Sequence, residues 1–179
     1  MSYITTASGL HFDPMNPDMN LINIEDIAHA LSYMARANGH MKIFYSVAQH
    51  SLACAAEAMQ RGCSNEVVLG CLLHDASEAY ICDLTRPIKK ELPLYIETEE
   101  ALLKVIWTKL VGRDMTDEEK EIIFDIDDDM LSLEFHQLMP EDLGDRYKNL
   151  SVKHICKTKD FDSIKKEFVD MYYFIKDKM

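Results

Sequence analysis

The stretch VVLGCLLHDASEAY, residues 67–80, decides the fold of this protein, because it sets a histidine and an aspartate side by side in an apolar segment. Val67, Cys71, His74 and Glu78 follow an i, i+4, i+7, i+11 spacing, which puts them on one face of a helix. We therefore expect His74 and Glu78 to point inward. An inward imidazole and carboxylate need polar partners, which other segments must supply.

Two other segments offer such partners. His50 shares a helical stripe with Val47 and Cys54, so it should also point inward. Asp127 lies at the edge of a stripe that is expected to be buried, formed by Ile123, Ile126, Met130 and Leu133. The alternative is a solvated acidic patch over residues 125–129, in which Asp128 could be the inward ligand instead.

A divalent cation would satisfy this set of side chains together. Burying an unpaired carboxylate or a charged imidazole is costly, whereas one ion can bind two imidazoles and two carboxylates. Such a donor set suits zinc, cobalt, manganese or iron better than calcium, and Mg²⁺ could accompany the phosphates of a substrate. The ligands expected for this site are His50, His74, Asp75 and Asp127.

The ion would lower the pKa of a bound water and polarise a phosphoryl oxygen. Glu78, one turn beyond the ligands, is placed to act as a general base or to orient that water, and Asp83 could assist it or hold a second ion. The alternative for each histidine alone is a hydrogen-bonded residue of the core. The coincidence of several polar residues on inward faces favours the metal site.

Helical spacing dominates the chain and predicts an all-α protein with a single domain over residues 1–179. Asn23, Ser64 and Asp160 or Asp162 are candidate helix caps, and Thr116 opens a capping box with Glu119. Pro87 and Pro93 indicate a loop over residues 81–93. A small hairpin is expected at residues 9–12. The expected helices cover residues 24–37, 46–61, 65–80, 95–111, 116–138 and 160–175.

Composition excludes several classes of function. The formal charge of −12 argues against binding of a nucleic acid polymer or an anionic membrane, because both need a basic face. No apolar run approaches the length of a membrane span, and the amino terminus lacks the pattern of a leader peptide. The five cysteines show no Cys-x-x-Cys spacing, which favours buried thiols in a reducing compartment. We expect a cytoplasmic protein.

With His50, the His74–Asp75 pair and the distant Asp127, the chain resembles the HD-domain metal-dependent phosphohydrolases. Longer runs, IEDIAHALS at residues 24–32, FYSVAQHS at residues 44–51 and LLHDASEAY at residues 72–80, resemble the small deoxynucleotide-hydrolysing branch of that family. This branch includes bacterial 5'-deoxynucleotidases and phage dATP triphosphohydrolases. The resemblance covers roughly residues 9–140. Relatives carry Glu seven residues after the last ligand, as Glu134 follows Asp127, so the resemblance favours Asp127 over Asp128.

The resemblance implies an HD-type helical bundle with its metal site between helices, and roles for further residues. Glu78 and Asp83 would be catalytic, and Arg36 and Lys89 would meet the phosphates of a deoxynucleotide substrate. For Arg36 the alternative is a surface charge at a helix end, which the helix dipole favours. Relatives often carry Trp directly after this Arg, whereas this chain has Ala37. Related enzymes form dimers or larger rings, so self-association is expected.

The resemblance implies hydrolysis of a 2'-deoxynucleotide, and its phage branch favours dATP, giving deoxyadenosine and triphosphate, as the leading reaction. A phosphatase acting on deoxynucleoside 5'-monophosphates would use the same residues, because the spacing of these residues does not indicate how many phosphates the substrate carries. Two further candidates are a nucleotide-binding protein of the same fold without turnover and a cyclic-nucleotide phosphodiesterase. The complete set of expected ligands and catalytic residues favours an enzyme over a binding protein.

Overall fold

The computed structural model describes residues 3–140, 150–151 and 153–179, and in this part of the chain the predicted all-α class is confirmed. The strands in this part of the chain form a single pair, with two residues in each strand. None of the described helices is long and apolar enough to cross a membrane. In chain order the elements are β1 (Ile4–Thr5), β2 (His11–Phe12), η1 (Met19–Leu21), α1 (Ile24–Tyr33), η2 (Arg36–Gly39), α2 (Val47–Gln60), α3 (Asn65–Leu73), α4 (Glu78–Ile81), α5 (Arg86–Lys89), α6 (Pro93–Leu110), α7 (Asp117–Leu138) and α8 (Phe161–Lys176).

The amino-terminal hairpin is tied to the helices by its turn and by one aromatic side chain. The expected hairpin at residues 9–12 is longer, with β1 antiparallel to β2 and Gly9 in the turn at φ 84°. Ser8 donates from its backbone N–H and from its hydroxyl to Asp26, at 2.7 Å each, on the first turn of α1. Phe12 is fully buried and stacks on Tyr80 of α4.

Helix α1 ends at Tyr33, four residues before the predicted end at residue 37. Met34 is extended, and Ala35 forms an antiparallel bridge with Ser46 just before α2. The chain then enters η2, where Ala37 and Asn38 both have left-handed backbone angles. This long-range bridge ends the helix, and it turns Arg36 away from the surface position that a helix terminus would give it.

Helix α3 ends at Leu73, so the predicted helix does not continue through residue 80. Ser64 caps its start as expected, and His74 is its last, half-helical residue. Backbone N–H groups then bond three residues back, from Ala76 to Leu73 at 3.0 Å and from Glu78 to Asp75 at 3.1 Å. His74 and Glu78 therefore lie on two elements joined by a tight turn.

The remaining boundaries agree closely with the predictions. Ser46 and Thr116 open α2 and α7 with complete capping boxes, and Asp160 caps α8. Helix α6 begins with Pro93 at its first position. The predicted loop at residues 81–93 instead contains the one-turn helix α5, with Pro87 in its first turn.

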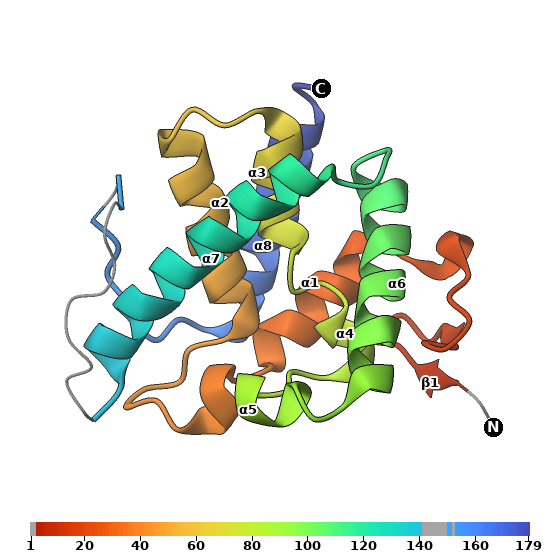
Figure 1. Ribbon diagram of the computed structural model, residues 1–179, viewed down its shortest axis with the longest axis horizontal. Coiled ribbons are helices and arrows are strands. Elements are labelled where there is room, and N and C mark those ends of the chain that lie inside the picture. The colour runs from red at the N-terminus through yellow and green to blue at the C-terminus, as the bar shows by residue number, and fades with distance from the viewer. Residues whose placement is uncertain (1–2, 141–149, 152) are drawn as a thin grey trace.

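Helices α2 and α3 form the centre of the molecule (Figure 1). Helix α7 lies diagonally across them on one face, and α8 covers them from behind. The buried stripe predicted on α7 is confirmed, because Ile123, Ile126, Met130 and Leu133 all lie in the apolar core. Trp107 of α6 is also buried there, as expected. This packing brings α2, the end of α3 and the middle of α7 together.

Candidate metal centre

Four side chains from three segments converge between α2 and α7. The Nε2 atoms of His50 on α2 and His74 at the end of α3 are 3.2 Å apart. Asp127 Oδ1 lies 2.9 Å from Nε2 of His50 and 3.6 Å from Nε2 of His74. Asp75 Oδ2 lies 3.9 Å and 3.3 Å from the same two nitrogens. Asp128, in contrast, is 61% exposed and pairs with Arg86.

The outer ring nitrogens show how these imidazoles are oriented. Nδ1 of His74 is 2.8 Å from the carbonyl oxygen of Cys71, which can only accept, so this nitrogen carries a proton. Nδ1 of His50 is 2.8 Å from Oε1 of the fully buried Glu134. In the neutral imidazoles both Nε2 atoms are then acceptors, and they face each other and Asp127. Such contacts between acceptors repel unless a proton or a cation lies among them.

The distances fit a shared divalent cation. With bonds of about 2.1 Å to nitrogen or oxygen, neighbouring ligand atoms around one ion stand roughly 3 to 3.5 Å apart. The contacts of 2.9 to 3.9 Å among the two imidazoles and two carboxylates lie near that range. Hydrogen bonds from the far ring nitrogens to a carboxylate or a carbonyl are the usual support of histidine ligands. The residues present therefore fit the expected metal.

The charges around the imidazoles also favour a cation. Burial and the neighbouring Arg36 oppose the charged form of His50, yet Cys54, Glu134 and Asp127 outweigh them and hold its pKa well above the usual value. Burial similarly opposes the charge on His74, but the neighbouring carboxylates raise its pKa. Burial would raise the pKa of Asp127, and hydrogen bonds from both imidazoles instead hold it well below the ordinary range.

Cys54 adds a possible ligand that the sequence did not single out. His50, Cys54, His74 and Asp127 each offer one ligand atom, all within 4.8 Å of one another, so this group could bind a metal ion. The sulfur of Cys54 lies 3.5 Å from Nε2 and 4.0 Å from Nδ1 of the same imidazole. It is therefore beside the ring and not in front of the Nε2 lone pair. Asp75, with Oδ2 at 3.9 Å and 3.3 Å from the Nε2 atoms of His50 and His74, is a further donor beside this group.

Arg36 is largely buried at the edge of the candidate metal centre. Its Nη1 donates to Asp75 Oδ2 at 3.2 Å, and its Nη2 lies 3.6 Å from Glu134 Oε2. Its side chain is only 11% exposed, so the alternative of a surface charge at a helix end is wrong. The guanidinium holds one expected ligand and the carboxylate that supports His50.

Glu78 lies beside this cluster with a strongly perturbed carboxyl group. It is buried, and its Oε2 has no hydrogen-bond partner among the described residues. Burial, together with the charges of Asp75 and Asp83, raises its pKa well above the usual value. Burial also raises the pKa of Asp83. Both groups have the environment expected of residues that hold and release protons.

Two cavities open beside the expected ligands. The Arg36 cavity, of about 460 Å³, is bordered by Arg36, Glu78, Asp83 and Phe135 and by both ligand carboxylates. The Lys90 cavity, of about 390 Å³, is bordered by His74, Arg86, Lys90 and the same carboxylates. Lys89 borders both cavities and forms an ion pair with Glu99. The structure thus brings all of the predicted site residues to one place, with His50 buried beneath.

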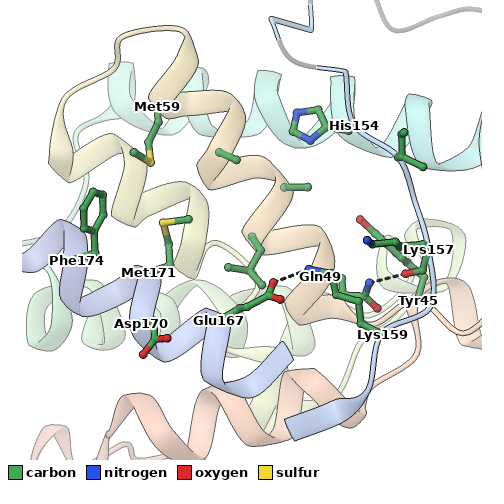
Figure 2. Close-up of a pocket in the computed structure, with 14 residues that line it drawn as sticks. Tyr45, Gln49, Met59, His154, Lys157, Lys159, Glu167, Asp170, Met171 and Phe174 are labelled. Atoms are coloured by element: carbon green, nitrogen blue, oxygen red, sulfur yellow. Dashed lines mark hydrogen bonds and ion pairs between the residues drawn. The ribbon is translucent and has the colours of Figure 1, made fainter. Parts of the chain in front are cut away.

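A larger cavity, of about 590 Å³, lies away from this cluster, between α2, α8 and residues 154–159 (Figure 2). Its floor includes Met59, Met171 and Phe174. Polar groups at its edge already have partners. Gln49 donates to the carbonyl oxygen of Lys157 at 2.8 Å, and Lys159 pairs with Glu167 at 2.5 Å. Its lining includes none of the predicted site residues.

Several residues of the centre were not predicted to be functional. Two of them could have been found from helical spacing. Glu134 follows Asp127 by seven residues, and Cys54 follows His50 by four, so each lies on the inward face of its helix. Arg86 could not, since it lies in the proline-containing loop. It contacts Oδ2 of Asp127 at 3.4 Å and also binds Asp128.

Comparisons with known proteins give two uncharacterised relatives. The chain is 44% identical over 111 residues to the uncharacterised protein YfdR of Escherichia coli (strain K12), a match covering 61% of this chain and 58% of that protein. It is 37% identical over 105 residues to an uncharacterised protein of Rhodobacter capsulatus, covering 55% and 53% of the two chains. The chain thus matches just over half the length of these relatives. No family model matches the sequence.

Proposed function

We propose that this protein is a metal-dependent phosphohydrolase of the HD-domain type, which hydrolyses 2'-deoxynucleotides and, above all, dATP to deoxyadenosine and triphosphate. One observation carries the proposal. The inward-facing nitrogens of His50 and His74 converge with the carboxylates of Asp75 and Asp127 at the border of two cavities. Glu78, a buried carboxyl with a raised pKa, lines one of these cavities, the Arg36 cavity.

Different residues of the chain would have separate roles in such a reaction. A divalent ion held by the four ligands would supply activation of water and polarisation of the phosphoryl oxygen. Glu78 would take up and return protons at its Oε2, which is free of hydrogen bonds to described residues. Arg36 contacts Asp75 and lies at the cavity wall, where its positive charge would stabilise the negative charge on the phosphoryl oxygens.

The preference for dATP rests on the resemblance of residues 9–140 to the small deoxynucleotide-hydrolysing branch. The Arg36 cavity supports a nucleoside substrate, because Leu131, Phe135 and Met139 give it an apolar wall. A monophosphate phosphatase would use the same ligands and the same Glu78. The number of phosphates is therefore the point that an assay must decide.

A panel of substrates tests the proposal directly. The protein is loaded with Zn²⁺, Co²⁺ or Mn²⁺ in turn and incubated with dATP, dAMP and a cyclic nucleotide, and the products are separated by anion-exchange chromatography. We expect triphosphate from dATP. Orthophosphate from dAMP, with dATP untouched, would reject the preference for dATP in favour of a 5'-nucleotidase. No turnover of any nucleotide with any metal would leave only a binding protein.

Replacing the carboxyl of Glu78 tests its role. Glu78→Gln keeps the size of the side chain but cannot exchange a proton at Oε2, so we expect kcat to fall by about a hundredfold or more. The matched control is Glu97→Gln, an exposed position on α6. Unchanged turnover in Glu78→Gln would remove Glu78 from the mechanism.

A further inference from the structure

The two cavities beside the metal centre share one wall. Asp75, Asp127, Arg86 and Lys89 border both of them. Arg86 and Lys89 are the ends of the one-turn helix α5, which therefore lies between the cavities. A phosphoryl group bound by an ion at Asp75 and Asp127 would therefore lie next to both cavities.

The two sides differ in chemistry. The Arg36 cavity is lined by apolar side chains at Leu84, Pro87 and Phe135, which suit the base and sugar of a nucleoside. The Lys90 cavity carries Arg86 and Lys90 close to the expected ligands. Both cavities carry cationic and apolar side chains, since Arg36 also lines the first and Ile96, Leu103 and Phe124 also line the second. Lys90, however, lines only the second.

The cations of the Lys90 cavity are not equally available. Lys89 is already neutralised by its ion pair with Glu99. Lys90 is exposed and forms no ion pair with another described residue. The side chain of Arg86 is 57% exposed and uses Nη2 for its contacts with Asp127 and Asp128. Lys90 is therefore the most available cation for an incoming anion, and Arg86 could add the guanidinium nitrogens that its contacts with Asp127 and Asp128 do not use.

We propose that the Lys90 cavity binds the phosphates that lie beyond the one under attack, with Arg86 and Lys90 as their ligands. This assignment rests on the proposed function and deepens it, because a nucleoside monophosphate would leave this cavity unused. It makes the substrate a nucleoside polyphosphate. Glu100 also lines the cavity, and its carboxylate suits a polyphosphate that arrives with Mg²⁺, an ion that is usually bound by one or two carboxylates together with phosphate oxygens.

Binding of inorganic tripolyphosphate tests this assignment without any turnover. The Zn²⁺-loaded protein is titrated by calorimetry with tripolyphosphate and with orthophosphate, in excess Mg²⁺ that limits stripping of Zn²⁺, and bound Zn²⁺ is measured afterwards. We expect tripolyphosphate to bind at least about tenfold more tightly than orthophosphate. Lys90→Gln should weaken tripolyphosphate binding about tenfold, the value of one charge-assisted hydrogen bond, and Lys90→Glu should weaken it further.

The control is Lys104→Gln, an exposed position on α6 that lines neither cavity, and it should bind tripolyphosphate as the wild type does. Equal affinity for the two anions, or equal losses in Lys90→Gln and the control, overturns the assignment. The proposed function has a separate outcome. If dATP is hydrolysed but tripolyphosphate binds no better than orthophosphate, only the cavity assignment fails. If tripolyphosphate binding depends on Lys90 but no nucleotide is hydrolysed, only the hydrolase proposal fails.

Discussion

Glu134 is the residue on which the orientation of His50 depends. Its Oε1 accepts from Nδ1 of His50 at 2.8 Å, and its side chain is fully buried. Carboxylates that hold a histidine ligand in this way typically contribute ten- to hundredfold to metal affinity. We expect Glu134→Gln to weaken Zn²⁺ binding by about that factor, measured by competition with a chromophoric chelator.

Glu121→Gln is the matched control, because Glu121 is exposed on the same helix and should leave Zn²⁺ affinity unchanged. Circular dichroism of both variants separates loss of the fold from loss of the metal. A folded Glu134→Gln protein with wild-type affinity would show that His50 is not a ligand oriented by this carboxylate.

The pairing of Glu134 with His50 illustrates what single residues reveal before a structure exists. The inward position of His50, His74 and Asp127 follows from local helical spacing, and the structure brings these three together. Arg86 could not be found in this way, because its contact with Asp127 depends on how the proline-containing segment folds back onto α7. Residues on regular faces are predictable from spacing, whereas residues on connecting segments are not.

At the scale of elements, the start of α7 is held by a carboxylate with several partners. Both oxygens of Glu119 accept from Arg113 at 2.7 Å, and Oε2 also accepts from the backbone N–H of Thr116 at 2.9 Å. The hydrogen bonds from Arg113 lower the pKa of Glu119 from 4.5 to about 2. Slight burial opposes this shift, and the backbone N–H of Thr116 adds to it. The folded state therefore binds this proton more weakly than the unfolded chain.

A carboxyl with a depressed pKa stabilises the fold above its ordinary pKa, and this contribution is lost as the pH falls. We expect Glu119→Gln to be less stable than wild type at neutral pH, and the difference to shrink as the pH falls from about 4.5 to about 2. Urea unfolding followed by circular dichroism at a series of pH values measures it. A difference that stays constant over this range would show that the ion pair does not stabilise α7.

Contacts between helices explain where sequence-based boundaries succeed and fail. The start of α7 was predictable because its capping box lies within four consecutive residues, from Thr116 to Glu119. The end of α1 was not, because the bridge between Ala35 and Ser46 joins segments eleven positions apart. The end of α3 depends on the turn that aims His74 at the metal centre. Local signals fix the start of α7, a tertiary contact ends α1, and a tight local turn ends α3.

Gly70 sets how closely α3 approaches α7. A Cβ at this position would lie 2.4 Å from Cδ1 and 3.2 Å from Cγ1 of Ile123, a buried side chain. In an open helix, Gly→Ala would gain about 1 kcal/mol. Here we expect Gly70→Ala to destabilise instead, because crowding in a packed core costs about 1–3 kcal/mol. Chemical denaturation of both proteins measures whether the free energy of unfolding falls or rises.

The partner substitution Ile123→Val removes Cδ1, the atom that the new Cβ meets most closely. Alone it should cost about 0.5–1.5 kcal/mol. The double variant should lose less unfolding free energy than the two single variants lose together, since the closest clash is gone. Simple additivity would show that the contact between α3 and α7 is not limited by Gly70.

At the scale of the whole molecule, the metal centre joins segments that are far apart in the chain. His50 and His74 are 24 residues apart, and His50 and Asp127 are 77 apart. Without an ion, only protons on the imidazoles offset the repulsion among the two Nε2 atoms and the two carboxylates at the junction of α2, α3 and α7. A bound cation would turn this repulsive junction into a link between the three helices.

Removing the metal should therefore lower the stability of the entire fold. An ion present at a hundred times its Kd stabilises the folded state by about 2.7 kcal/mol. Because chelation removes this stabilisation, Tm should fall by roughly 5–10 °C for a chain of this length. Differential scanning calorimetry of the Zn²⁺-loaded protein, before and after EDTA, measures the shift. Asp127→Asn, which lacks one expected ligand, should respond much less to EDTA. A wild-type Tm that does not change with EDTA would mean that the convergence of His50, His74, Asp75 and Asp127 is held by protons alone and binds no ion.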